Sequence, residues 1–285
     1  VGLAKQFADD GRMHTTFLIM VTATGRLSSS DPNLQNIPVR TELGSEIRKM
    51  FVPSDGCVFV DADYSQIELR VLAHIADDQT MLDSVRACTE IYTATAAQVF
   101  GVEPEQVTPL MRRHAKAVNF GIVYGISEFS LADDIGVTRK EARQYIDNYL
   151  AHYAGVRNYM HDIVEQAKQD GYGTTLFGRR RELPELKSSN FNIRSFGERV
   201  ALNTPIQGTA ADIIKLAMLR VDAALKKQKL KARLVLQVHD ELLVECPEKE
   251  AEQVKKIVTA EMENVVQLRV PLLAEAKVGA SWYEA

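Results

Sequence analysis

Two acidic residues stand at the ends of hydrophobic segments that lie far apart in the chain. Asp63 follows the apolar run 57–60, and Asp240 follows the run 234–238. If folding brings these carboxylates together at strand ends, they offer the oxygen ligands that Mg²⁺ prefers, while the ion keeps part of its water. Two such ions can hold the attacking and leaving oxygens of an in-line phosphoryl displacement. The pattern therefore predicts phosphoryl chemistry at a site for two Mg²⁺ ions.

A predicted helix between these segments carries a stripe of basic and aromatic residues. Thr108-Pro109 is a typical helix start and Gly125 a typical stop. The residues of the stripe recur every four positions, so they share one face over about 18 Å; they are Arg112, Lys116, Phe120 and Tyr124. The cations lie towards the positive end of the helix dipole and could bind a triphosphate, and a base could stack on the aromatic rings. An ordinary amphipathic helix that buries its Phe and Tyr explains this stripe about equally well.

Each acidic position also has a structural explanation when it is taken alone. Asp63 could simply end a strand, and Asp240 could form a turn beside His239. Glu68 lies three residues after Ser65, which is the spacing of a helix capping box. Together, however, the segments supply a metal site, a triphosphate site and a stacking surface, and that combination favours a nucleotide-dependent enzyme.

Composition is that of a globular protein without a membrane span. The chain has 285 residues, of which 46% are hydrophobic and 25% charged, and it contains no apolar run of membrane length and no signal peptide. Its first residue is Val1, which suggests a fragment or a processed chain. Three cysteines without metal-ligand spacing suggest free thiols and a cytoplasmic location: Cys57, Cys88 and Cys246. A net charge of -4 argues against nucleic-acid binding over the whole surface but allows a local basic channel.

The order of the expected elements predicts an α+β chain in which one subdomain is inserted into another. We expect helices over 138–152, 154–170, 192–202, 208–228 and 248–266, with Pro205 as an interruption. Residues 174–183 could form a small hairpin or a loop, and 233–246 should form a hairpin with His239-Asp240 at its turn. A last strand is expected near 270–278.

Several motifs, in order, resemble those of the A family of DNA polymerases, and the resemblance spans nearly the whole chain. Residues 63–70 resemble the first catalytic motif, 112–125 the second and 237–241 the third. Residues 24–29 and 31–38 are similar to the primer-template motif, and 207–212 to a further block of the family pattern.

This resemblance implies an antiparallel-sheet palm with an inserted, mainly helical fingers subdomain. The palm would comprise residues 1–75 and 196–285, and the fingers residues 76–195. The implied activity is template-directed addition of deoxynucleoside triphosphates to the 3′ end of a primer on primer-template DNA. The protein would be a monomer, free of membranes, in the bacterial cytoplasm and associated with the nucleoid.

The resemblance also implies a role for individual residues. Asp63, Asp240 and the Tyr64 carbonyl would hold two Mg²⁺ ions, with Glu241 supporting the site and Lys116 protonating the leaving pyrophosphate. The nucleotide would be bound by Arg112, Lys116, Phe120, Tyr124, Gln66, Glu68 and Tyr92, with Glu68 excluding a ribose 2′-hydroxyl. DNA would be bound along its minor groove and at the primer end, by Arg26, Asn33, Gln35, Asn36, Arg199, Asn203, Gln207 and His239.

Two segments depart from the family pattern. Glu90-Ile91-Tyr92 stands where the family carries Asp-Ile-His, and Leu18-Ile19-Met20 replaces a polar segment. The family's thumb precedes this region, so we expect a chain limited to palm and fingers that holds duplex DNA weakly. The alternatives are a catalytically weak binding module without a thumb and a magnesium-dependent nuclease. The sequence lacks the phosphate-binding motif of a P-loop NTPase, which argues against that class.

Overall fold

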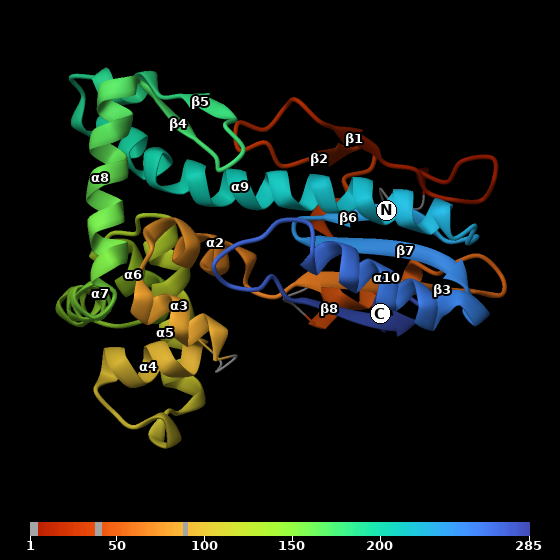
Figure 1. Cartoon of the computed structure of the whole chain (residues 1–285), viewed down its shortest axis with the longest axis horizontal. Helices are drawn as coiled ribbons and strands as arrows, with labels where there is room; N and C mark the ends of the chain where they lie inside the picture. The colour runs from red at the N-terminus through yellow and green to blue at the C-terminus, as the bar shows by residue number, and fades with distance from the viewer. Residues whose placement is uncertain (1–4, 38–41, 88–90) are drawn as a thin grey trace. The chain divides into compact units, whose positions relative to one another are not determined.

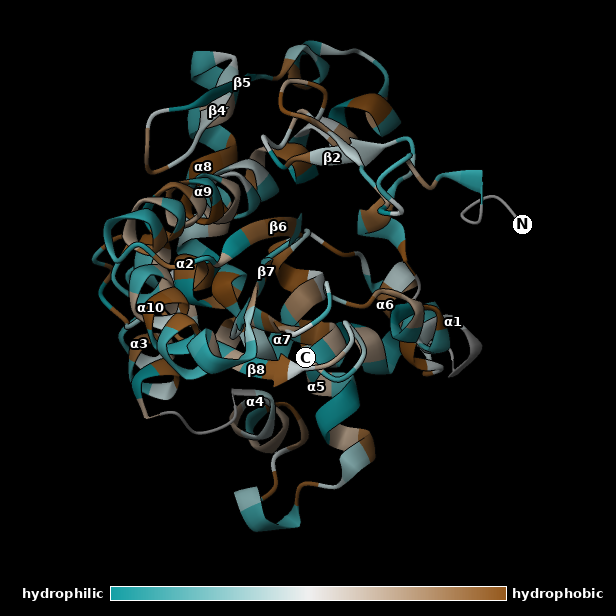
Figure 2. Cartoon of the chain, turned by 90° about the vertical axis from the view of Figure 1, so that its right-hand side faces the viewer, coloured by the Kyte–Doolittle hydropathy of each residue, from teal (hydrophilic) through white to brown (hydrophobic). Residues whose placement is uncertain are grey.

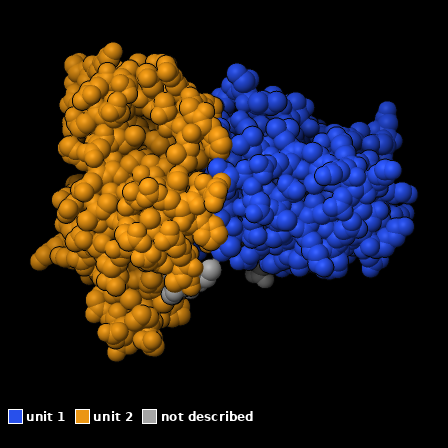
Figure 3. Space-filling view, viewed as in Figure 1, with its two compact units in different colours: residues 1–67, 210–266, 272–285 blue, residues 68–209, 267–271 orange. Residues whose placement is uncertain are grey.

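The computed structural model describes residues 5–37, 42–87 and 91–285, and its fold is α+β (Figure 1). Val1, Cys88 and Glu90, which were named from the sequence, lie outside the described residues, as does the last residue of the segment 31–38. Two compact units divide the chain (Figure 3). Unit 1 comprises residues 1–67, 210–266 and 272–285, and unit 2 comprises 68–209 and 267–271. Unit 2 is thus inserted into unit 1 along the sequence.

Unit 1 is built on a four-stranded antiparallel sheet with the strand order β6-β7-β3-β8. These strands are β3 (Cys57–Tyr64), β6 (Arg233–Val238), β7 (Glu241–Pro247) and β8 (Ala274–Gly279). The predicted hairpin is therefore present, with residues 239 and 240 at its turn. β3 runs four residues beyond the predicted apolar run, because its polar residues, Asp61 and Asp63, alternate with buried Ala62 and Tyr64.

Apolar side chains cover both faces of this sheet. Helix α10 (Ala251–Glu263) packs on one face through Val254, Val258 and Met262, which are all buried. On the other face, Phe59, Val238, Leu243 and Trp282 form a core cluster with Leu34 and Ile37. The apolar residues of β6 and β7 appear brown in Figure 2. Short elements complete the N-terminal part: β1 (Thr16–Leu18), β2 (Ser28–Ser30), η2 (Leu34–Asn36), α1 (Glu42–Glu46) and η3 (Ile47–Met50).

Unit 2 is mainly helical. Its helices include α2 (Ile67–Ala76, whose first residue belongs to unit 1), α3 (Gln79–Arg86), α4 (Ile91–Phe100), α5 (Pro109–Val123), α6 (Glu128–Ile135), α7 (Arg139–His152) and α8 (Ala154–Asp170). α7 and α8 occupy the ranges predicted for them, and Thr138 and Glu141 form the capping box of α7. The small hairpin is also present, as β4 (Tyr172–Thr174) and β5 (Arg180–Glu182).

Two predictions about helix ends are wrong. Helix α9 (Phe191–Lys227) continues through Pro205, although a proline inside a helix costs about 3 kcal/mol. Val200, Ala201, Ile206 and Ala210 are buried on both sides of the proline, and that packing offsets the cost. At α2, Ser65 is not the capping residue, because the helix begins at Ile67 and the intervening Gln66 has a left-handed φ of 56°.

None of the helices in the described ranges is both long and apolar enough to cross a membrane.

Candidate active site

Four acidic residues converge at one end of the unit 1 sheet. In the antiparallel register, Asp63 of β3 lies opposite Glu241 of β7 and opposite Glu275 of β8. The backbone amide of Tyr64 donates to the carbonyl oxygen of Asp240 at 3.2 Å, so the β6–β7 turn lies beside the end of β3. Two segments separated by more than a hundred residues thus bring Asp63 and Asp240 together.

The carboxylates at this end of the sheet repel one another. Burial raises the pKa of Asp63 to about 7, and repulsion from Asp240, Glu241 and Glu275 adds to the shift. The Asp63 side chain is nevertheless accessible to solvent, so an ion can reach its oxygens. A bound cation would favour the ionised carboxylate and offset the repulsion, so this donor set fits a cation site.

Glu241 is held by two side chains that the sequence did not indicate. The indole Nε1 of Trp282 donates to Glu241 Oε1 at 2.6 Å, and Arg48 approaches the same oxygen at 3.5 Å. The Arg48 guanidinium also lies over the Trp282 ring, 4.1 Å from its centroid. Trp282 is only 1% exposed. Glu241 is therefore anchored to the core, which suits a residue that supports the site from beside it.

Asp61 is a further acidic residue that sequence reasoning missed. It lies two residues before Asp63 on the same face of β3, and the two-residue period of a strand could have indicated this. Burial raises the pKa of Asp61 to about 9, helped by Glu241 and opposed by Arg48. Burial thus favours the protonated form of Asp61, which lowers its contribution to the negative charge of the cluster.

In unit 2, helix α5 presents its basic residues to solvent. Thr108 caps the helix by accepting from the Met111 amide at 3.2 Å. Ala115, Val118, Ile122 and Val123 are buried on one side of the helix. The predicted stripe lies on another side, with Arg112 and Lys116 exposed, Phe120 half-buried and Tyr124 37% exposed. The alternative of an amphipathic helix that buries Phe120 and Tyr124 in the core is therefore wrong for Tyr124, and Phe120 is only partly buried.

Glu68 and Tyr92 lie close to this stripe within unit 2. The Tyr124 hydroxyl donates to Glu68 Oε2 at 2.9 Å, and Glu68 is only 5% exposed. Tyr92 of α4 is 6% exposed, and its ring centroid lies 6.3 Å from that of Phe120. Burial raises the pKa of Tyr92 to about 12, with a further contribution from the Glu68 carboxylate. The phenol therefore stays neutral beside a buried acid.

The residues predicted to contact DNA differ in how accessible they are. In unit 1, Gln35 is 8% exposed and donates to the carbonyl and side-chain oxygens of Gln237, both at 3.1 Å. Asn33 caps η2 through a bond from the Gln35 amide at 3.1 Å. Gln35 is thus buried, whereas Asn33, Asn36 and His239 are exposed and Arg26 is half-exposed. The atypical segment 18–20 ends β1, and its Met20 is 91% exposed.

Three further candidates in unit 2 lie along one face of α9. Arg199 is exposed and donates to Ser195, and Asn203 donates to Gln207 at 3.1 Å. Gly125 follows α5 with a φ of 64°, and a side chain there would meet Leu202 at 3.0 Å and Arg199 at 3.2 Å. Glycine is therefore required at this position both by its φ and by the close approach of α9.

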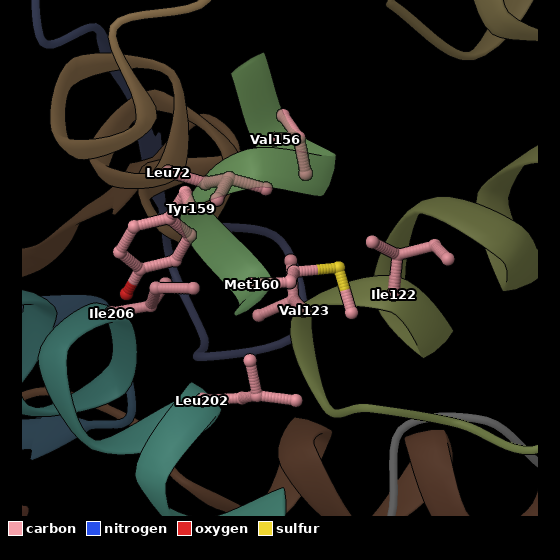
Figure 4. Close-up of a pocket in the computed structure, with 8 residues that line it drawn as sticks. All are labelled: Leu72, Ile122, Val123, Val156, Tyr159, Met160, Leu202 and Ile206. Carbon is pink, nitrogen blue, oxygen red and sulfur yellow. The ribbon is translucent and has the colours of Figure 1, made fainter. Parts of the chain in front are cut away.

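An apolar gap under the end of α5 is not a ligand site. Side chains of α2, α5, α8 and α9 surround it, and Figure 4 labels them all. The lining is formed by Leu72, Ile122, Val123, Val156, Tyr159, Met160, Leu202 and Ile206, and the gap has no room for a water molecule.

We predict that Asp63→Asn raises the midpoint of thermal unfolding at pH 8 when no divalent cation is present. The folded state raises the pKa of Asp63, so ionisation lowers stability as the pH rises from the unfolded value of about 4 towards the folded value. The advantage of the variant should therefore disappear below about pH 4. Differential scanning calorimetry checks this, with Asp55→Asn, an exposed acid in the turn before β3, as the control. A variant no more stable than the parent at pH 8 would contradict the raised pKa of Asp63.

Comparison with known proteins agrees with these geometries. The family model described as DNA polymerase family A matches residues 2–284. "DNA polymerase I" of Bacillus subtilis (strain 168) is 57% identical over 279 residues, which cover 97% of this chain and 32% of that protein. "DNA polymerase I" of Caldicellulosiruptor bescii is 55% identical over 274 residues, which cover 96% and 32%. The chain thus spans about a third of the length of these curated relatives.

A solved structure is similar over the whole chain. It is described as the POL domain of Pol1 from M. smegmatis in complex with DNA primer-template and dNTP. The TM-score is 0.96 at 46% sequence identity, and the match covers 100% of this chain and 50% of that one. Because the family model covers nearly every residue, the chain belongs to DNA polymerase family A.

Proposed function

We propose that this chain is a DNA-directed DNA polymerase that adds deoxynucleotides to the 3′ end of a primer. The observation that carries the proposal is the convergence of Asp63 and Asp240 at the end of the unit 1 sheet. Membership of DNA polymerase family A supports the same reaction. The similar M. smegmatis domain is a complex with primer-template and dNTP, so we propose these as the partners of this chain as well.

Magnesium is the cation that the donor set fits best. The described residues contain no group of three or more His, Cys, Asp or Glu side chains placed to hold a metal ion. Asp63 and Asp240 would therefore be the side-chain ligands, joined by the Tyr64 carbonyl, water and substrate phosphates. A hard cation that keeps part of its water suits such an incomplete oxygen site. When bound, two Mg²⁺ ions would supply the positive charge that an in-line displacement at the α-phosphate needs.

The exposed face of α5 would bind the triphosphate. Arg112 and Lys116 would contact its oxygens, and Lys116 would donate a proton to the leaving pyrophosphate. Phe120 and Tyr124 would pack against the sugar and the base. Gln66, which precedes α2 with its left-handed φ, would contact the nucleotide as well. A nuclease has no need of a triphosphate-binding face, so α5 favours a polymerase over a nuclease.

Glu68 would select the sugar of the nucleotide. Its carboxylate is buried and fixed by Tyr124, so it could not move aside for a 2′-hydroxyl without losing that hydrogen bond. The structure argues against the alternative that Glu68 serves in a capping box with Ser65. Such a cap requires α2 to begin at residue 66, whereas the helix begins at Ile67.

The remaining assignments follow the same family pattern. Unit 1 would be the palm and unit 2 the fingers, in a monomer associated with DNA in the bacterial cytoplasm. Duplex DNA would be contacted by Arg26, Asn33, Asn36, Arg199, Asn203, Gln207 and His239, with the buried Gln35 holding the loop that carries Asn36. Minor-groove contacts suit an enzyme that must accept every sequence, because readout there is degenerate.

We expect Asp63→Asn and Asp240→Asn each to reduce primer extension at least about 100-fold, because each removes one charged ligand from the cation site. Single-nucleotide extension of a labelled primer, titrated with MgCl₂, measures the effect. Asp55→Asn should extend the primer like the parent chain. Near-parental extension by either active-site variant at saturating magnesium would refute the metal assignment. A parent chain that binds dNTP but never extends a primer would instead support a non-catalytic binding module.

We also expect Glu68→Ala to raise the incorporation of ribonucleotides relative to deoxynucleotides by about tenfold or more, because the variant opens space beside the sugar. Tyr124→Phe is the matched variant, since it removes the hydrogen bond to Glu68 but keeps the carboxylate. Its sugar selectivity should fall between those of Glu68→Ala and the parent. Unchanged selectivity in Glu68→Ala, together with a lower unfolding temperature, would leave Glu68 a structural role only.

A further inference from the structure

The two cations of α5 lie against aromatic rings. Lys116 Nζ lies 5.6 Å from the centroid of the Tyr92 ring and 5.9 Å from that of Phe120. The guanidinium of Arg112 lies 5.8 Å from the same Tyr92 centroid. These distances are within the range at which a cation is attracted to the face of an aromatic ring. Tyr92 is therefore shared by both basic residues, while Phe120 adds a second ring beside Lys116.

Given the polymerase function proposed here, we infer that Tyr92 is a positioning residue, whose ring holds Arg112 and Lys116 in the orientation in which they meet the triphosphate. Both cations are exposed, and an exposed Lys or Arg side chain loses rotamer entropy when it binds an anion. A ring that restricts these side chains beforehand lowers that loss and raises the affinity for the anion.

The Tyr92 ring, which we call the aromatic platform, also leaves the positive charge of the two basic side chains available to the phosphate. A carboxylate partner would orient a lysine equally well, but it would neutralise the charge that the phosphate needs. Lys116 forms no ion pair or hydrogen bond with the described residues, so its contacts are the two rings. The two cations also stand four residues apart on one helix, where like charges repel. Attraction of both to one ring opposes that repulsion.

The position of Tyr92 in the fold suits a fixed platform. The residue is 6% exposed on α4, which packs against α5. Because the pKa of Tyr92 is raised, the phenol does not ionise near neutral pH and brings no negative charge to the cations. The inferred role belongs to the ring, and the hydroxyl is not needed for it.

Three variants separate this role from a merely structural one. Tyr92→Leu removes the ring, and Tyr92→Phe keeps the ring and removes the hydroxyl. Phe100→Leu is the matched control, because Phe100 belongs to the same helix and lies beside His114 of α5, with ring centroids 6.2 Å apart. Its ring contacts are with His114 and Tyr145, whereas the rings beside Arg112 and Lys116 are those of Tyr92 and Phe120.

Binding of inorganic tripolyphosphate to the full chain, measured by calorimetry without divalent cations, tests the platform independently of turnover. Tyr92→Leu should raise the Kd about tenfold, whereas Tyr92→Phe and Phe100→Leu should stay close to the parent. In single-nucleotide extension, Tyr92→Leu should raise the KM for dNTP more than it lowers kcat, and Tyr92→Phe should restore both constants.

Equal losses in Tyr92→Phe and Tyr92→Leu would assign the role to the hydroxyl and overturn the inference. An equal loss in Phe100→Leu would overturn it too, because it would reduce Tyr92 to general packing of α4 on α5. If the parent chain binds tripolyphosphate but extends no primer, the polymerase proposal fails. The role of the Tyr92 ring is then still tested by the tripolyphosphate Kd values of the variants.

Discussion

The antiparallel register of β3 with its two neighbours is the constraint on which the candidate site depends. It sets Asp63 opposite Glu241 on one side and Glu275 on the other, and the β6–β7 turn adds Asp240. A shift of one residue in this pairing would turn Asp63 to the face that packs on α10. The core cluster around Phe59 and Trp282 opposes such a shift, because the same shift would remove Phe59 from that cluster. The apolar core thus fixes a cluster of acids that electrostatics alone would disperse.

The acidic residues around Asp63 and the basic residues of α5 have different kinds of partner. Around Asp63, burial favours the protonated form of Asp61, and Glu241 is paired with Trp282 and Arg48. Asp63 itself stays accessible and is repelled by its neighbours, which is the state that a cation would relieve. On α5, Lys116 is held against aromatic rings, so its orientation is restricted while its charge remains. In both cases the fold leaves a charged side chain without a full counter-charge, which is typical of functional sites.

Local signals in the sequence predicted what local interactions determine. Thr108-Pro109 and Gly125 predicted α5, and the turn at His239-Asp240 was placed correctly, because caps and turn formers act over a few residues. The features that were missed depend on distant contacts. The hydrogen bond from Trp282 to Glu241 joins residues that are not related by any local sequence pattern. Helix α9 continues through Pro205 because the residues on both sides of the proline are buried. Strand periodicity could have placed Asp61 on the same face as Asp63. Its raised pKa could not be predicted in this way, because it depends on burial and on the neighbouring Glu241 and Arg48. The roles of the site residues remain proposals that rest on the family pattern.

The central claim is that Asp63 and Asp240 form one cation site whose carboxylates are kept in mutual repulsion until an ion binds. Electron paramagnetic resonance of free and bound Mn²⁺, recorded across a pH series on the full chain, tests it most directly. The account predicts saturable binding that weakens as the pH falls below about 7, since Asp63 is then protonated. Binding should be lost in Asp63→Asn and in Asp240→Asn and retained in Asp55→Asn. Mn²⁺ binding that is unchanged in both active-site variants, or that is independent of pH between 5 and 8, would contradict the account.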